Sequence, residues 1–450
     1  MKNNYDIIVI GTGAAASGVA YKCKSSGLSV AVIDELPYGG TCANRGCDPK
    51  KVLVGAAEVF DWAQRMKGKG IDSNNLKINW KELMSFKRSF TDPVPDSREK
   101  RFRKAGIDTF HGSVKFTGVQ SVKVDGKELT AKYIHIAAGA KPAPLNIPGE
   151  EYLTYSDQFL ELDDLPKNIV FAGGGYISME FAHIAVRAGA NVTIIHRGTR
   201  VLERFDPDLV NQLTAATLEA GINLRLNTSV NAISKKENKL VVSATSGDDK
   251  ETIETDMVVH GAGRVPAVAD MNLEAANIEW SRKGVKVNEY LQSVSNPYIY
   301  AAGDVADTKG LPLTPVAGSE SQIAASNIIK GNSKTANYSG TPSVAFTLPP
   351  IASVGLTEDE AEKQGIKIMV KKKETGWWYS SKRIVEKHSG FKTLVEEDTG
   401  QIIGAHLLGS HAAEVINLFA MAIRFNIPAS EIRKIIFAYP TNSSDVIYMV

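Results

Sequence analysis

The chain has 450 residues, too many for a single hydrophobic core, so we expect two to four domains. Hydrophobic residues make up 43% and charged residues 23% of the sequence, as in ordinary soluble globular proteins. The 52 basic and 50 acidic residues leave a net charge of +2, which gives no electrostatic reason to expect a nucleic-acid or membrane partner.

Apolar runs and cysteine usage indicate the compartment. No segment approaches the roughly eighteen unbroken apolar residues that span a bilayer. The first apolar run is interrupted by glycine and followed by no cleavage signature, which favours a strand over a signal peptide. Three cysteines in the whole chain do not make a disulfide framework. We therefore expect a cytoplasmic protein, in which a bond between two of the cysteines would be catalytic.

The N-terminal part of the chain alternates apolar runs with glycines. The run at residues 7–10 predicts a buried parallel strand. Gly11 then permits a tight turn, Gly13 lets backbone N–H groups approach a pyrophosphate, and Ala16 lets helix and strand pack closely. The next apolar run ends at Asp34, which is placed to accept a hydrogen bond from a ribose hydroxyl. This layout predicts a dinucleotide-binding unit with the phosphates at a helix N-terminus.

The stretch GGTCANRGCDPKK, residues 39–51, holds two of the three cysteines. A disulfide needs its Cα atoms within about 7 Å, whereas five residues of ideal helix rise about 7.5 Å. A bond between Cys42 and Cys47 therefore requires a turn or a distorted helix start, which Gly46 and Pro49 would allow. A structural zinc site would need four ligands, so no metal is expected here.

The strand–glycine–helix–strand pattern returns in NIVFAGGGYISMEFAHIAVRAGANVTIIHR, residues 168–197. Gly173 and Gly175 take the first two small positions and Ser178 the third. Two complete fingerprints imply two dinucleotides, and an enzyme carrying both usually passes a hydride from a nicotinamide to a tightly held flavin.

The second strand of this repeat ends at His196 and Arg197, where an acid would be expected for NADH. Arg197, Arg200 and Arg204 gather around this point. A guanidinium group matches a 2′-phosphate with bidentate geometry, which favours NADPH.

Three further segments end a strand in a sharp turn. IHIAAGAKP turns near Gly139, VVHGAGRVP turns near Gly263, and YIYAAGDVAD places Asp304 after its strand. Each combines a strand end with a glycine or an acid, which is typical of a turn near a ligand.

These motifs together resemble one family. GGTCANRGCDPKK is similar to the redox-active disulfide motif of the pyridine nucleotide–disulfide oxidoreductases, which include glutathione reductase, dihydrolipoamide dehydrogenase and mercuric reductase. The resemblance covers nearly the whole chain, because both fingerprints, GAGRVP, AAGDV, LTPVA and PSVAFTLPPIASVGLTEDEA occur in the expected order.

The resemblance implies bound FAD and NADPH. The residues that would hold FAD are Gly11, Gly13, Asp34, Gly40, Thr41, Lys50, Asp304 and Thr314. The other positions expected to contact the nucleotides are Ala16, Gly139, Ala317, Gly173, Gly175, Tyr176, Ile177, Arg197, Arg200 and Gly263.

The resemblance also assigns catalytic roles. Cys47 would be the charge-transfer thiol beside the flavin, and Cys42 the outer thiol that attacks the substrate. Lys50 and Glu180 would form an ion pair near the flavin, and Tyr176 would cover the flavin until the nicotinamide displaces it.

The expected fold is α/β, with two Rossmann-like dinucleotide-binding domains and a C-terminal α+β domain that makes a homodimer. Residues 1–145 and 265–335 would form the FAD domain, 146–264 the NADPH domain, and 336–450 the dimerisation domain. The segment AAEVINLFAMAIRF in the last of these has apolar residues at helical spacing, which predicts a buried stripe.

One position departs from the family pattern. Most members end with a His-Pro pair followed by a glutamate, and the histidine serves as acid–base in the partner's active site. Here Tyr439 precedes Pro440, and Ser444 and Asp445 follow where the glutamate would be. A phenol has an unperturbed pKa near 10, so it cannot exchange a proton near pH 7 as imidazole does.

Three functions stay open. The leading hypothesis is an FAD enzyme that uses NADPH to reduce the Cys42–Cys47 disulfide and then an unidentified thiol-linked acceptor. The second is a reductase of quinones, metal ions or dyes, in which no thiol leaving group needs a proton. Mercury itself is disfavoured, because the chain ends VIYMV without the C-terminal cysteines of mercuric reductase. The third, a redox-responsive binding protein, is disfavoured by the complete set of Lys50, Glu180, Arg197 and both cysteines.

Overall fold

The computed structural model describes residues 3–450, which form two compact units. Unit 1 comprises the described residues up to Lys50 together with 86–143 and 263–338. Unit 2 comprises 51–85, 144–262 and 339–450. The boundaries near residues 50 and 85 fall within the helices α3 (Cys47–Arg65) and α4 (Trp80–Thr91).

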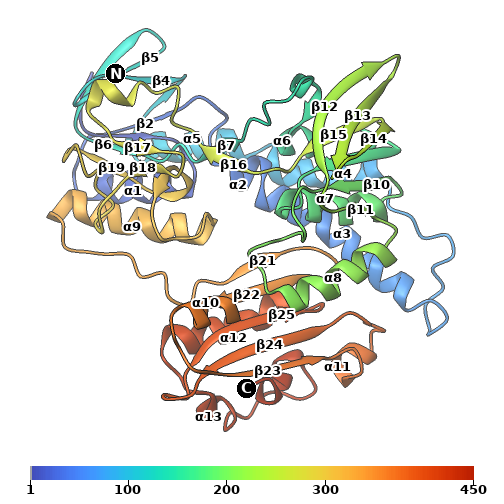
Figure 1. The fold of residues 1–450 in the computed structure, drawn as a ribbon. Coiled ribbons are helices and arrows are strands. Elements are labelled where there is room, and N and C mark those ends of the chain that lie inside the picture. The colour runs from blue at the N-terminus through green and yellow to red at the C-terminus, as the bar shows by residue number, and fades with distance from the viewer. Residues whose placement is uncertain (1–2) are drawn as a thin grey trace. The chain divides into compact units, whose positions relative to one another are not determined.

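Unit 1 is built on a seven-stranded sheet in the order β3-β2-β1-β6-β5-β4, with β19 also paired to β6 (Figure 1). The pairs among β3, β2, β1, β6 and β19 are parallel, and β4 and β5 extend the sheet antiparallel. The strands are β1 (Asn4–Ile10), β2 (Val30–Asp34), β3 (Asp108–His111), β4 (Val114–Gly118), β5 (Ser121–Val124), β6 (Lys127–Ile136) and β19 (Ile299–Ala301).

Both faces of β1 are buried, as the unbroken apolar run predicts. Ile7 and Val9 pack with residues of α1 (Ala14–Ser25) and α9 (Thr314–Lys330), which lie side by side in Figure 1. Ile8 and Ile10 belong to a second core on the other face. The remaining elements of unit 1 are α2 (Gly40–Arg45), α5 (Val94–Lys104), β7 (Ala140–Pro142), β16 (Arg264–Pro266), η2 (Leu273–Ala276), β17 (Trp280–Ser281), β18 (Gly284–Lys286), η3 (Gly303–Val305) and β20 (Ala306–Asp307).

The first half of unit 2 holds a parallel five-stranded sheet in the order β11-β10-β9-β15-β8. An antiparallel meander, β12-β13-β14, is part of the same segment. The elements are η1 (Glu150–Tyr152), β8 (Leu153–Thr154), α6 (Ser156–Phe159), β9 (Asn168–Ala172), α7 (Tyr176–Arg187), β10 (Asn191–Ile195), α8 (Pro207–Glu219), β11 (Asn223–Arg225), β12 (Ser229–Lys236), β13 (Lys239–Ser246), β14 (Asp249–Thr255) and β15 (Met257–His260).

The C-terminal part of unit 2 is an antiparallel sheet, β21-β22-β25-β24-β23, packed against α12. The predicted apolar stripe of α12 is confirmed, because Val415, Phe419 and Ala422 are buried in this core. The elements are β21 (Ser343–Ala345), β22 (Ile351–Gly355), α10 (Glu358–Lys363), β23 (Ile368–Glu374), α11 (Tyr379–Lys382), β24 (Gly390–Glu396), β25 (Ile402–Leu408), α12 (Ala412–Arg424), α13 (Ala429–Ile432) and η4 (Asn442–Tyr448).

The largely parallel sheet of unit 1, the parallel sheet of unit 2 and the antiparallel sheet with its helix confirm the predicted α/β fold class. Unit 2 contains residues 144–262 and 339–450, most of two segments that the sequence assigns to separate domains, and residues 51–85 in addition. The predicted domain boundaries stay predictions. Over residues 3–450, no helix is long and apolar enough to cross a membrane.

Candidate functional site

The two cysteines of the GGTCANRGCDPKK stretch lie on either side of a helix break. Cys42 is in α2 and Cys47 is the first residue of α3, and Gly46 separates the helices with φ −143° and ψ −112°. A Cβ added at Gly46 would lie 2.9 Å from the Thr41 carbonyl oxygen and 3.3 Å from the Cys42 Cα. The chain therefore turns tightly at Gly46, which is the irregularity that the sequence requires for the two thiols to meet.

Both cysteines are free thiols in the structure and share a hydrogen bond. The Cys47 sulfur lies 3.5 Å from Thr314 Oγ1, at the start of α9, and the Cys42 thiol is 3.8 Å from Asp48 Oδ1. Thr314 and Cys47 are thus brought together from the last and first chain segments of unit 1, and their roles at a flavin stay predictions.

The two thiols have opposite acidities. The hydrogen bond from Cys42 lowers the pKa of Cys47 to about 6, with further lowering by Thr314 and the positive charge of Lys50, against burial and Asp48, which raise it. The pKa of Cys42 is raised well above its ordinary value, first by its hydrogen bond to Cys47 and then by burial. Both shifts favour the thiolate on Cys47 and the proton on Cys42.

The glycine turn of the first fingerprint packs against the start of α2. Gly11 has φ +108°, and a Cβ there would lie 2.3 Å from the Ala137 carbonyl oxygen, so only glycine fits. Gly13 caps α1, and a Cβ on Gly40 would lie 2.4 Å from the Gly13 Cα. The glycines of the fingerprint and of the cysteine motif therefore form one bare backbone surface, of the kind a pyrophosphate needs.

Thr12 is a residue of this turn that sequence reasoning missed. Its hydroxyl donates to Asp34 Oδ2 at 2.6 Å and accepts from the Gly39 N–H at 3.0 Å. It thereby ties the end of β2 to the cysteine motif. The only signal in the sequence is a hydroxyl residue between the two glycines, which the fingerprint itself does not specify.

Two of the expected FAD residues are carboxylates, Asp34 at the end of β2 and Asp304 in η3. Burial raises the pKa of both Asp34 and Asp304. Gly303, beside Asp304, donates its N–H to Glu320 Oε2 at 2.7 Å, and Glu320 is itself buried on α9. Sequence reasoning missed Glu320, whose only signal is one acid among the small residues of that helix.

The other expected positions of unit 1 lie at turns and helix contacts. Gly139 and Gly263 both have positive φ, +70° and +115°, and follow β6 and β15. Ala16 and Ala317 are buried, and a Cβ on Gly303 would lie 3.2 Å from the Ala317 Cβ. Small residues therefore keep α1, α9 and the Asp304 turn in close contact. Gly40 is buried, whereas Thr41 is exposed at the surface of α2.

The second fingerprint forms the corresponding turn in unit 2. Gly173 has φ +107°, and a Cβ there would lie 2.4 Å from the Gly261 carbonyl oxygen. Gly175 caps α7, whose first turn has neither an acidic residue nor a side-chain cap. The buried Ser178 packs so tightly that a Cβ on Gly261 would lie 2.0 Å from its Oγ. The free N–H groups at the start of α7 suit an anionic ligand.

The loop that follows β10 contains a carboxylate that the sequence pattern does not place there. Arg197 is exposed, but Arg200 donates through Nη2 to the Glu203 carbonyl oxygen at 3.1 Å. The Glu203 carboxylate lies beside the strand end, with Oε1 3.3 Å from His196 Nε2. The arginines expected at this point are therefore accompanied by an acid.

Residues of α7 hold the helix to the C-terminal part of unit 2. The Tyr176 hydroxyl is 2.5 Å from Ser343 Oγ, and Glu180 Oε1 accepts the Phe346 N–H at 2.8 Å. Ile177, the next expected residue, is half-buried beside them. Lys50 and Glu180 are both buried, and their pairing stays a prediction.

The C-terminal departure from the family pattern is visible in unit 2. The Tyr439 side chain is 81% exposed. Asp445 accepts a hydrogen bond from Ser380 Oγ at 2.5 Å, and burial raises its pKa. The Ser444 hydroxyl donates to the Thr441 carbonyl oxygen. Asp445 and Ser444 are thus engaged locally, whereas the Tyr439 phenol faces outward.

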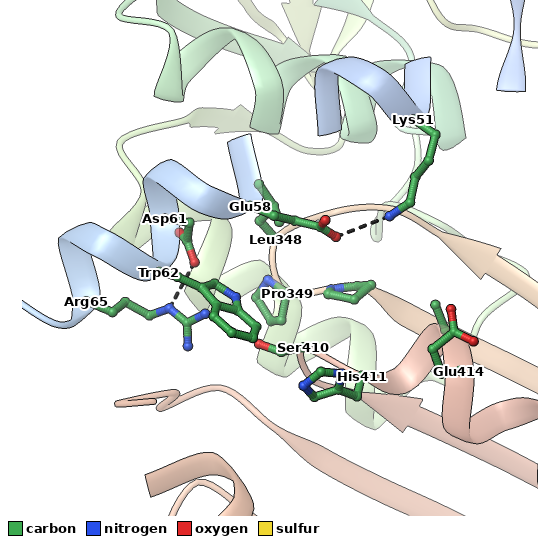
Figure 2. A pocket seen from close by; sticks show the side chains of 12 residues that line it. Lys51, Glu58, Asp61, Trp62, Arg65, Leu348, Pro349, Ser410, His411 and Glu414 are labelled. Atoms are coloured by element: carbon green, nitrogen blue, oxygen red, sulfur yellow. Dashed lines mark hydrogen bonds and ion pairs between the residues drawn. The ribbon is translucent and has the colours of Figure 1, made fainter. Parts of the chain in front are cut away.

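A cavity of about 280 Å³ in unit 2 lies between α3 and the start of α12 (Figure 2). Lys51 pairs with Glu58 at 3.2 Å. The Trp62 and His411 rings meet edge to face with centroids 5.9 Å apart. The lining residues are Lys51, Glu58, Asp61, Trp62, Arg65, Leu348, Pro349, Pro350, Ser410, His411, Ala413 and Glu414. The cavity is of mixed charge, and among the described residues no cluster of three or more His, Cys, Asp or Glu side chains could hold a metal ion.

Comparisons with known proteins agree with this geometry. Residues 5–321 match the family described as pyridine nucleotide-disulphide oxidoreductase, and residues 341–449 match the dimerisation domain of the same family. The chain is 31% identical to a mercuric reductase of Lysinibacillus sphaericus, over 98% of this chain and 81% of that protein. It is also 31% identical to a glutathione reductase of Burkholderia cepacia, over 99% and 98% of the two chains.

A solved structure is similar over the whole chain. It is the Cu(II) complex of the HOCl-induced flavoprotein disulfide reductase RclA from Escherichia coli. The TM-score is 0.88 at 27% sequence identity, with 100% of this chain and 99% of the other covered.

Proposed function

We propose that this chain, which belongs to the pyridine nucleotide–disulfide oxidoreductases, passes a hydride from NADPH through FAD to a Cys42–Cys47 disulfide and on to a disulfide-type acceptor. That it is an FAD-dependent oxidoreductase of this family is established by the matches over both parts of the chain. Members of the family use FAD and NAD(P)H, and the match to the dimerisation domain supports a homodimer. The acceptor and the choice of NADPH are the proposal.

The observation that carries the proposal is the helix break at Gly46 between Cys42 and Cys47, with the Cys47 sulfur 3.5 Å from Thr314 Oγ1. Bound FAD would supply the electron pair of the nicotinamide's hydride to the disulfide. Once the disulfide bond is broken, Cys42 would hold a proton and Cys47 would remain as the thiolate, which Thr314 and Lys50 stabilise. A stabilised leaving thiolate makes this reduction favourable.

Reoxidation balances the electrons. Cys42 attacks one sulfur of the acceptor disulfide and forms a mixed disulfide, releasing the first acceptor thiol. The Cys47 thiolate then attacks Cys42, which releases the second thiol and restores the Cys42–Cys47 bond. The acceptor gains two electrons and two protons per NADPH, with one proton drawn from solvent.

The preference for NADPH is supported by Arg197, whose side chain is exposed directly after β10. In an α/β sheet this strand end is where the adenosine ribose binds. A free guanidinium there suits a 2′-phosphate.

A second candidate is the reduction of a metal ion or quinone. It is favoured by the exposed Tyr439 in place of the acid–base histidine, because these acceptors release no thiolate that needs a proton. The names of two similar proteins also refer to metals, in a mercuric reductase and in a Cu(II) complex.

Steady-state NADPH oxidation with a panel of small disulfides, quinones and metal ions separates these functions. Turnover with disulfides, lost in Cys42→Ser, is the expected result. Turnover confined to quinones or metal ions would favour the second candidate. No turnover with any acceptor, in a protein that binds FAD, would refute both.

A further inference from the structure

The loop between β10 and α8 places an acid and a base at the same strand end. Glu203 Oε1 and His196 Nε2 are 3.3 Å apart, and the His196 side chain is 14% exposed whereas that of Glu203 is 64% exposed. His196 is therefore fixed within the fold, and the Glu203 carboxylate is open to a ligand. Arg197 is exposed on the residue beside His196.

Two glycines leave room for this pair. A Cβ on Gly174, in the glycine turn, would lie 2.7 Å from the His196 ring, and a Cβ on Gly198 would lie 2.4 Å from Glu203 Oε1. The imidazole therefore fills the space between the glycine turn and the carboxylate. Arg200 fixes the backbone at the same residue, because its Nη2 donates to the Glu203 carbonyl oxygen. The His196 ring therefore contacts the carboxylate directly, while Arg200 holds the main chain of the same residue.

The end of β10 has a known role in dinucleotide-binding folds, where it contacts the adenosine ribose. The glycine turn and the start of α7 suit the pyrophosphate, so the end of β10 faces the adenosine ribose. A carboxylate at this point accepts hydrogen bonds from ribose hydroxyls, whereas a 2′-phosphate there is repelled by it. Arg197 has the opposite effect. The chain therefore presents both charges to the same group.

We propose that Glu203, oriented by His196, is a specificity residue that accepts the ribose 2′-hydroxyl of NADH and opposes the 2′-phosphate of NADPH. The proposal rests on the proposed function, because it assigns that nucleotide to unit 2. Glu203 limits the preference that Arg197 creates, and the enzyme binds both nucleotides. A carboxylate supplied by a loop, eight residues after Ile195 at the end of β10, replaces the acid that usually ends this strand.

Isothermal titration of the oxidised FAD-loaded protein with NAD⁺ and NADP⁺ tests the assignment without turnover. Glu203→Gln removes the charge but keeps an acceptor oxygen, so NADP⁺ affinity should rise about tenfold while NAD⁺ affinity stays within about twofold. Glu203→Ala also removes the acceptor, so NAD⁺ affinity should fall about five- to tenfold. Glu254→Gln, an exposed glutamate on β14, makes the same charge change and should alter neither.

The outcomes separate the two levels of the proposal. Unchanged affinities in both Glu203 variants, or equal changes in Glu203→Gln and Glu254→Gln, would overturn the role of Glu203 while wild-type binding of either nucleotide upholds the proposed function. A wild-type protein that binds neither nucleotide would overturn both. A tenfold gain for NADP⁺ in Glu203→Gln that decreases as salt is added would support the repulsion directly.

Discussion

The acidity of Cys47 is the property on which the proposed chemistry depends, and substitution of Cys42 measures its cause. A pKa of about 6 leaves about 90% of Cys47 as thiolate at pH 7, whereas its ordinary pKa of 9.0 would leave about 1%. The largest contribution to this lowering is the hydrogen bond from Cys42. Cys42→Ser keeps a donor at this position, and Cys42→Ala removes it.

The expected difference between the two variants follows from the strength of that bond. A hydrogen bond to a charged group is worth about 1.5–3 kcal/mol, and one pKa unit corresponds to about 1.36 kcal/mol. The pKa of Cys47 should therefore be about 1–2 units higher in Cys42→Ala than in Cys42→Ser. Thr314 and Lys50 remain in both variants and should keep both values below 9.

The long-wavelength charge-transfer absorbance of the FAD-loaded protein provides the assay, because it reports the Cys47 thiolate. In Cys42→Ser the band should be present without reductant at neutral pH and disappear as the pH falls through the pKa, since the lowered pKa makes the thiolate the form above it. Cys47→Ser is the control and should show no band. Equal midpoints in the Ser and Ala variants would refute the hydrogen-bond account. A band in Cys47→Ser would show that the two cysteines have been assigned in reverse.

Four further outcomes test separate parts of the structure. Asp48→Asn should move the pH midpoint of the charge-transfer band to lower pH, because the Asp48 charge raises the pKa of Cys47. Arg197→Glu should reduce the ratio of kcat/KM for NADPH to that for NADH about ten- to a hundredfold, the loss of a bidentate phosphate contact, and an unchanged ratio would contradict the role of Arg197. Tyr439→His should accelerate oxidation of the reduced enzyme by small disulfides by up to about 10²-fold in rapid mixing, without affecting flavin reduction; no gain would mean that another group already supplies the proton. Lys392→Met should lower the unfolding free energy by about 3–5 kcal/mol in denaturant titration, because it leaves the fully buried Asp206, 2.9 Å from Lys392 Nζ, without its cation.

The sequence predicts the two nucleotide-binding turns well, because their requirements are local. Gly11 and Gly173 have positive φ, and a side chain at either would meet a backbone carbonyl oxygen within 2.4 Å. No amino acid other than glycine satisfies both conditions, so each of these turns requires glycine at its first position. The turn at Gly46 was predictable for a similar reason, since two thiols five residues apart can meet only if the helix is interrupted.

The residues that sequence reasoning missed act through tertiary hydrogen bonds. Thr12 links Asp34 to Gly39, and Glu320 supports Gly303 from a helix that follows in the chain. Glu203 reaches the end of β10 only because the loop folds back on His196. A loop conformation has no periodicity, so no pattern in the sequence places these side chains near a ligand.

The distribution of protons in the reduced pair bears on which acceptor the chain can serve. At neutral pH the pair holds one proton, on Cys42, because the pKa of Cys42 is raised and that of Cys47 is lowered. A protonated thiol is a weak nucleophile, so Cys42 must lose its proton as it attacks. Asp48 Oδ1, 3.8 Å from this sulfur, accepts a hydrogen bond from the Cys42 thiol, and Tyr439 stands where most family members have the acid–base histidine. An anionic disulfide would be repelled by the negative Asp48, and the thiolate that it releases would lack a proton donor. A neutral or cationic acceptor that leaves no thiolate would face neither obstacle. Disulfides should therefore be reduced at a rate set by the proton on Cys42, and acceptors that release no thiolate should escape this limit.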